Sequence, residues 1–233
     1  DSTSYVISRN PFRKPPARRA YIFTLGEVDG LLREAIARRS RFRMSHLNHY
    51  MIIGLLAFTG LRTQECLNLN VEDWREKYSE LFVRRGKFGK DRVIPVDSSV
   101  KEKMTFFTRR REEFGEFRGD APLFLGPRRS RLHKACFHKV FSELLDKCGI
   151  DRNPPTSRPP TIHSLRHTFA VNNIIKWVRQ GKDVNAMLPY LSRYMGHVGV
   201  ASTQVYLQSV EELRRVGAEK FHQLFARCVR RDD

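Results

Sequence analysis

Apolar residues recur at helical spacing near the start of the chain. The segment Thr24-Leu25-Gly26-Glu27 matches a helix-capping box, in which a Thr hydroxyl and a Glu carboxylate three residues later satisfy free backbone N–H groups. Apolar residues follow it at helical intervals, at Val28, Leu31, Leu32, Ala35 and Ile36. The pattern predicts a helix that begins at residue 24 or 25 and packs one face against a core.

A second apolar helix is predicted over about residues 45–58. It ends at Thr59-Gly60, since glycine readily takes the left-handed conformation that closes a helix. A new helix is predicted to begin at Thr63 or in the turn before it, which places Arg62 at its amino-terminal end.

Two short strand-like runs follow, at residues 81–84 and 92–96. The segment between them, Gly86-Lys87-Phe88-Gly89-Lys90-Asp91, contains two glycines and is typical of a hairpin turn.

The rest of the chain predicts helices at 98–114, 133–148, 184–194 and 210–229, and one more that bears His163 and follows a proline-rich loop at 151–160. The fold class is therefore α+β, mostly α-helical, with a small antiparallel β-hairpin sheet.

The charge balance points to a polyanionic partner. Lys and Arg number 43 against 25 Asp and Glu, which gives +18 and a pI near 10.3. Such a surplus favours nucleic acid as the partner, although a merely soluble basic protein is an alternative. We expect no membrane contact, because the longest apolar run, residues 51–58, is too short to span a bilayer.

The four cysteines are far apart and form no zinc-binding pattern. Reduced thiols and the lack of a signal peptide indicate a cytoplasmic protein, associated with the nucleoid if the source is bacterial.

Residues 1–20 combine positive charge with stiffening prolines. We interpret them as a basic, extended interdomain linker that runs along DNA and consider a solvated tail as the alternative. The cations in this segment are Arg9, Arg13, Lys14, Arg18 and Arg19. The catalytic domain would then occupy residues 21–233.

Most of the candidate catalytic residues lie in the last third of the sequence. His163 and Arg166 lie three positions apart, on one face of a helix, and His197 precedes Tyr206 by nine residues. Two imidazoles, a guanidinium and a phenol are suited to holding a phosphate diester and attacking it. His163 and His167 also share a helix face that would suit a metal ion, but no third ligand is apparent and we expect none.

This pattern resembles the tyrosine recombinase (phage integrase) family. The matching features are His-x-x-Arg at 163–166, Gly-His at 196–197, Tyr206, the Thr-Gly-Leu-Arg-x-x-Glu segment at 59–65 and the hairpin Lys87. They occur in the family's order over about residues 21–210. The spacing of 31 residues between Arg166 and His197 is longer than is usual in the family. We interpret the extra length as a longer loop or helix away from the phosphate.

The resemblance implies a DNA breaking–rejoining catalytic domain with a defined set of roles. Tyr206 would be the nucleophile and His163 its proton acceptor. Arg62 and Arg166 would hold the phosphate, with His197 as a further donor. Lys87 would protonate the leaving 5′-oxygen, and Glu65 would orient Arg62. No metal or cofactor is expected, since cations already offset the phosphate charge.

The family also implies a separate N-terminal core-binding domain, which we expect to be absent from this chain. The implied partner is double-stranded DNA, bound by a homo-oligomer, a tetramer on two duplexes. Further DNA contacts are expected from Lys90, Arg92, Arg128, Arg129 and Arg131. The implied function is site-specific integration or recombination for a mobile element. The alternatives are a type IB topoisomerase-like or resolvase-like enzyme and a non-catalytic basic DNA-binding module.

Overall fold

The structure is a computed structural model that describes residues 19–84, 91–114, 118–196 and 206. Within these ranges the fold prediction is confirmed, because helices dominate and the strands form a small antiparallel sheet. In chain order the elements are α1 (Leu25–Ala37), α2 (Ser45–Thr59), α3 (Thr63–Leu67), β1 (Trp74–Arg75), β2 (Glu80–Val83), β3 (Arg92–Pro95), α4 (Ser98–Glu112), α5 (Lys134–Lys147), α6 (Ile162–Arg179) and α7 (Val184–Met195). Two short 3₁₀ helices, Val71–Asp73 and Glu76–Tyr78, flank β1.

The predicted start of α1 and end of α2 are confirmed in detail. Thr24 and Glu27 form the complete capping box, and Gly60 closes α2 with φ of 63°. A side chain at Gly60 would also meet the ring of Phe169, on α6, at 2.4 Å. Glycine is therefore required here both for its conformation and for the close approach of α6.

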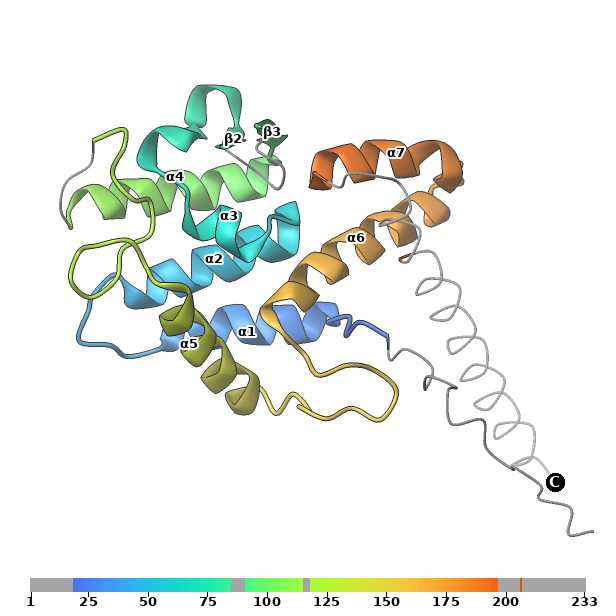
Figure 1. Cartoon of the computed structure of the whole chain (residues 1–233), viewed down its shortest axis with the longest axis horizontal. Coiled ribbons are helices and arrows are strands. Elements are labelled where there is room, and N and C mark those ends of the chain that lie inside the picture. The colour runs from blue at the N-terminus through green and yellow to red at the C-terminus, as the bar shows by residue number, and fades with distance from the viewer. Residues whose placement is uncertain (1–18, 85–90, 115–117, 197–205, 207–233) are drawn as a thin grey trace, which may run out of the picture.

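Helix α2 is the centre of the larger core. Most of its residues are buried, and it packs against α1, α4 and α6. The nearly continuous apolar run at residues 51–58 explains its central place, because a helix segment that is apolar on most sides must be covered on most sides. Figure 1 shows α1, α2, α4 and α5 grouped together, with α6 leading away from them towards α7.

Helices α6 and α7 share a second, smaller apolar core with Tyr206. Its buried members are Ala170, Val171, Ile174, Leu188, Leu191, Met195 and Tyr206. The start of α6 is fixed to the larger core, because the Phe23 N–H donates to the Thr168 hydroxyl over 2.8 Å. This packing places the first half of α6 between the two cores.

The sheet has the order β1-β2-β3, and both pairings are antiparallel. β2 pairs with β3 from Glu80 opposite Pro95 to Val83 opposite Arg92. The two predicted strands are confirmed, whereas the two-residue β1 was missed because it is too short to show alternation. Residues 85–90, which contain the predicted turn with Lys87 and Lys90, lie outside the described residues, as does the predicted helix at 210–229.

Basic residues at the end of α4 behave differently from one another. Arg109, Arg110 and Arg111 lie in the last turn of α4, where cations complement the helix dipole and usually face solvent. Arg111 is instead buried, 1% exposed, and donates to the carbonyl of Pro122 over 3.0 Å. Its place is structural, since helical periodicity turns it towards the core while Arg109 and Arg110 stay exposed.

Candidate active site

Three chain segments and one isolated residue meet around Arg166. These are the α2–α3 turn with Arg62, the first half of α6, the carboxyl end of α7, and Tyr206. The cluster brings together four residues that were predicted as catalytic: Arg62, Glu65, Arg166 and Tyr206. The first and last of them are 144 positions apart in the sequence.

Arg166 is buried, with 1% of its surface exposed. Its guanidinium donates to the carbonyl of Gly60 and, over 2.7 Å, to the carbonyl of Met195. It therefore joins the end of α2 to the end of α7. Burial and the charge of Arg62 lower the pKa of Arg166 to about 10, so the side chain remains a cation at neutral pH.

Glu65 lies between two arginines. Its carboxylate accepts from the Arg62 guanidinium at 2.8 Å and from Arg92 at 2.9 and 2.7 Å. Burial opposes its ionisation, but the bonds and charges of Arg92 and Arg62 outweigh burial and lower its pKa to about 2. The carboxylate is thus a fixed anion that binds Arg62 and Arg92 together.

The two arginines bound to Glu65 also reach the end of α7. Arg62 donates to the carbonyl of Gly196 over 2.6 Å, and Arg92 donates to that of Tyr194 over 3.1 Å. Strand β3, helix α3 and the end of α7 are therefore tied together. The long spacing after Arg166 does not carry the end of α7 away from the arginines.

Tyr206 is buried, with 4% of its surface exposed, and its hydroxyl oxygen lies 3.1 Å from Nδ1 of His167. Burial raises the pKa of the phenol, while Arg166 and Arg62 act in the opposite direction. A protonated phenol next to fixed cations can lose its proton as it attacks, provided that an acceptor is in reach.

His163 stands one helical turn before His167 and packs edge-on against it, with 4.6 Å between ring centres. Its side chain lies at the exposed rim of the cluster. The protein atoms that crowd the ring, together with Arg166 and Arg62, lower its pKa. The sequence named His163 as the proton acceptor, yet the contact with the phenol is made by His167. The spacing of 163 and 167 placed both on one helix face but could not show which of them meets Tyr206.

Several predicted residues lie outside the described part of the chain. These are Lys87 and His197 of the catalytic set, and Arg9, Arg13, Lys14, Arg18 and Lys90 of the DNA-contact set. Their roles remain predictions.

The remaining predicted DNA contacts fall into two groups. Arg19, Arg128 and Arg129 are exposed. Arg131 instead donates to the carbonyls of Leu67 and Leu69, over 2.9 and 3.1 Å, and Arg92 holds Glu65. Both of the latter side chains bind the protein's own groups, so for them the structure gives a role in the fold that the sequence did not reveal.

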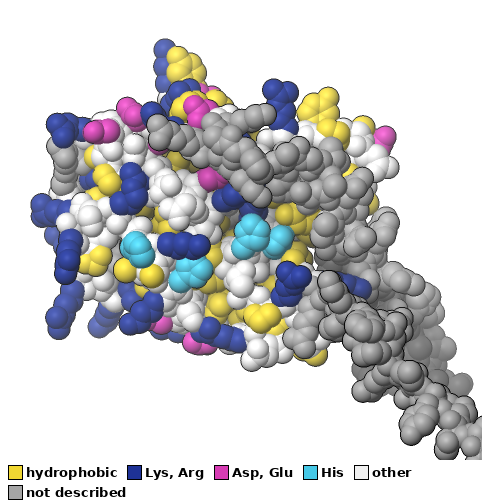
Figure 2. Space-filling model, in the orientation of Figure 1, with side chains coloured by type: hydrophobic (Ala, Val, Ile, Leu, Met, Phe, Trp, Pro, Cys, Tyr) yellow, Lys and Arg dark blue, Asp and Glu magenta, His cyan; other side chains and the backbone are white. Residues whose placement is uncertain are grey.

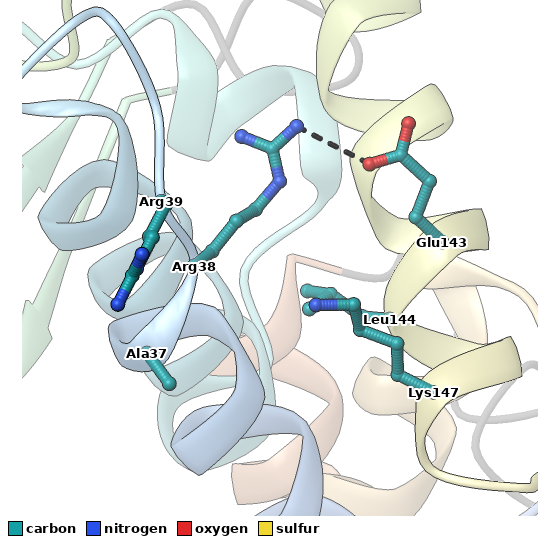
Figure 3. Close-up of a pocket in the computed structure, with 6 residues that line it drawn as sticks. All are labelled: Ala37, Arg38, Arg39, Glu143, Leu144 and Lys147. Atoms are coloured by element: carbon teal, nitrogen blue, oxygen red, sulfur yellow. Dashed lines mark hydrogen bonds and ion pairs between the residues drawn. The ribbon is translucent and has the colours of Figure 1, made fainter.

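A surface hollow of about 460 Å³ lies between the end of α1 and α5 (Figure 3). The Arg38 guanidinium reaches across it to the Glu143 carboxylate, 3.2 Å away. None of the residues that line it belongs to the Arg166 cluster, and we do not assign the hollow a catalytic role. In the described part of the chain, no group of three or more His, Cys, Asp or Glu side chains is placed to hold a metal ion.

Solved structures identify the class of fold. A XerA recombinase has a TM-score of 0.66 and 25% sequence identity, with 93% of this chain and 69% of that chain covered. The Tn1549 transposon integrase in complex with a circular intermediate DNA has a TM-score of 0.63 at 20% identity, with 83% of this chain and 63% of that chain covered. The fold is that of the tyrosine recombinase catalytic domain.

The sequence itself matches the phage integrase family model over residues 27–212, and the chain belongs to that family. The putative integrase/recombinase y4rB of Sinorhizobium fredii is 33% identical over 209 residues, which are 88% of this chain and 66% of the relative. A tyrosine recombinase of Pseudothermotoga lettingae is 30% identical over 213 residues, 89% of this chain and 64% of the relative. The chain thus spans about two thirds of the length of these curated relatives. None of the helices in the described part of the chain has the length and apolar character needed to cross a bilayer.

Proposed function

We propose that this chain is the catalytic part of a site-specific recombinase that cuts and rejoins DNA for a mobile element through a 3′-phosphotyrosine intermediate. The observation that carries the proposal is the position of Tyr206. Its phenol is buried within the electrostatic reach of Arg62 and Arg166 and contacts an imidazole. A phenol that contacts an imidazole and feels the charge of two arginines is suited to attack on a phosphodiester.

The cations would stabilise the negative charge that develops in the transition state. In-line attack on a phosphodiester increases the negative charge on its non-bridging oxygens. Donors fixed where charge develops are worth about 3–4 kcal/mol each in other enzymes. Arg166 and Arg62 are held by backbone carbonyls and by Glu65, so they need little reorganisation when the phosphate arrives. In this proposal Lys87 protonates the leaving 5′-oxygen and His197 donates to the phosphate, as the family resemblance implies.

DNA is the proposed partner. The net charge of +18 supports it, and Figure 2 shows Lys and Arg side chains spread over one face, with histidine side chains near its centre. The Tn1549 integrase and XerH recombinase structures were obtained with DNA bound. We further propose that residues 1–20 form the linker to a DNA-clamping domain, that residues 21–233 form the catalytic domain, and that four protomers act on two duplexes in the cytoplasm.

The test is capture of the covalent intermediate. A pool of nicked duplexes with randomised sequence lets the short fragment beyond the nick diffuse away after cleavage, which blocks rejoining. We expect a denaturant-stable protein–DNA adduct with the wild-type chain and none with Tyr206→Phe, which lacks the hydroxyl but keeps the ring. Tyr190→Phe is the matched control, because that phenol is 70% exposed on α7. Salt-sensitive binding without any adduct would instead identify a non-catalytic DNA-binding module.

Product analysis separates the recombinase from the rival with the same chemistry. Two duplexes that share a captured sequence should exchange strands. Relaxation of a single supercoiled circle without exchange would favour a topoisomerase-like enzyme.

A further inference from the structure

A partly apolar hollow opens on the surface where the end of α1, the start of α2 and the end of α4 meet. Its volume is about 680 Å³. Ile36 and Phe106 line it and are exposed apolar side chains, at 41% and 52%. The half-buried Leu47 and Phe114 and the buried Met44 complete the apolar lining. Proteins rarely leave such a group of side chains in water unless another molecule covers it.

Positive charge surrounds this apolar surface. Four arginines line the hollow: Arg38, Arg39, Arg43 and Arg110. Glu113 is the one carboxylate among the described residues that line it, and it pairs with Arg110 at 3.0 Å. Arg38 is turned towards Glu143, outside the hollow, whereas Arg39 points away from that pair (Figure 3). The hollow therefore combines apolar side chains with a net positive charge.

Two of the arginines lie against the phenylalanine rings. Cζ of Arg43 is 5.5 Å from the centre of the Phe114 ring, and Cζ of Arg110 is 5.9 Å from that of Phe106. These contacts place guanidinium charge directly beside aromatic surface. A ligand that has apolar and acidic groups next to one another can thus contact both kinds of side chain at once.

The hollow is remote from the Arg166 cluster. Helix α2 begins beside the hollow, next to Met44, and ends at Gly60, whose carbonyl accepts from Arg166. A helix of 15 residues is about 22 Å long. Figure 1 shows the end of α1 and the start of α2 on the side of the molecule opposite α7. A partner in the hollow is therefore kept apart from the site around Tyr206.

We infer that this hollow binds an amphipathic helix of another protein, with apolar side chains on one face and Asp or Glu beside them. Such a helix places apolar residues from successive turns into a groove, while its carboxylates meet the arginines. The inference concerns a surface that the proposed reaction does not use, so it is independent of the chemistry at Tyr206.

Charge argues against two occupants from the chain itself. A second copy would bring a further net charge of +18 to an already positive surface. The helix predicted at 210–229 contains four Lys or Arg against three Asp or Glu, so it offers no surplus of acid. Neither occupant complements the arginines as an acidic partner does.

Single-stranded nucleic acid is another polyanion with an affinity for arginines and phenylalanines, because bases stack on aromatic rings. The aliphatic part of the lining favours a peptide instead. Ile36, Met44 and Leu47 have no ring on which a base can stack, whereas they suit leucine-like side chains.

The test selects peptides against the full chain. A display library of helical peptides about 16 residues long, roughly four turns, is enriched in the presence of excess duplex DNA, which occupies the surfaces that bind DNA. We expect the enriched peptides to combine Leu, Ile or Phe at helical spacing with Asp or Glu. Fluorescence anisotropy then measures the affinity of the enriched peptides for the chain and its variants.

Two substitutions in the hollow should weaken binding. Phe106→Ser and Arg43→Glu should each lower the affinity about tenfold or more, the effect of losing a central interface side chain. Phe58→Ser and Arg179→Glu are the matched controls and should change it by less than about twofold. Phe58 is 48% exposed and Arg179 is exposed at the end of α6, and neither lines the hollow. Circular dichroism of all four variants should match that of the wild type.

Competition identifies the occupant. Neither oligo-dT nor a peptide of residues 207–233 should displace the enriched peptides. Displacement by oligo-dT would indicate a site for single-stranded nucleic acid, and displacement by the 207–233 peptide would indicate a site for the chain's own carboxyl-terminal segment. Either result overturns the inference. So does an enriched pool without acidic residues, or one that binds Phe106→Ser and Arg43→Glu as tightly as the wild type.

Discussion

The substitution Glu65→Gln removes the negative charge that Arg62 and Arg92 share. The glutamine has nearly the same shape as the glutamate, so packing is preserved. The two guanidiniums, whose side chains are 21% and 13% exposed, are left facing each other without a counter-charge. Removing one member of a largely buried ion pair is costly because the remaining charges stay desolvated.

The expected loss follows from the pKa of Glu65. Its fall from 4.5 to about 2 on folding stabilises the folded protein by about 3 kcal/mol at neutral pH, since a tenfold change in proton affinity is worth about 1.4 kcal/mol. Because the pKa is lower in the folded state, this stabilisation is complete above the unfolded value and is lost as the pH falls towards about 2. At pH 3 about half of it should remain.

Urea unfolding followed by circular dichroism measures the effect. We expect the variant to lose about 3 kcal/mol at pH 7 and about half as much at pH 3. Glu102→Gln is the matched control, because Glu102 is 74% exposed and its pair with Lys103 lies in solvent. It should stay within about 0.5 kcal/mol of the wild type. Equal stability of Glu65→Gln and wild type at pH 7, or the same gap at both pH values, would refute this account of the carboxylate.

Three further substitutions or reactions test other parts of the fold. Gly60→Ala should lower the free energy of unfolding by more than about 2 kcal/mol, because it combines a positive φ with a clash against Phe169. Gly149→Ala is the control, since Gly149 also has a positive φ, of 64°, but has open space around it. If Gly149→Ala lost as much stability as Gly60→Ala, the clash with Phe169 would not be the cause. Arg111→Ala should cost about 2–4 kcal/mol in urea unfolding, since it removes a buried donor and its packing, whereas Arg109→Ala should change stability by less than about 0.5 kcal/mol. Iodoacetamide should label the exposed Cys136 in the native protein and should reach Cys66 only on unfolding, because burial excludes the reagent and raises the pKa of the Cys66 thiol. Labelling of both cysteines at the same rate, measured by mass spectrometry, would contradict this prediction.

Local signals were sufficient to predict several of the helices. The Thr24–Glu27 capping box, the Gly60 stop and the apolar spacing of α5 each describe an interaction within a few residues, and each appears in the structure at the expected place. The residue types of the site were also readable, because Arg62, Arg166 and Tyr206 occur in an order that resembles one family.

The sequence by itself therefore determined most of the helices in the described part of the chain, the stop at Gly60 and the β2–β3 pairing, and it indicated a set of groups that could handle a phosphate. The tertiary structure alone decided that Glu65 serves two arginines, that Arg166 joins the ends of α2 and α7, and that His167 rather than His163 contacts Tyr206. The reason is physical. Helical periodicity fixes which residues share a face, but the partner of that face depends on how α6 and α7 pack, and their packing is set by apolar contacts between residues far apart in the chain.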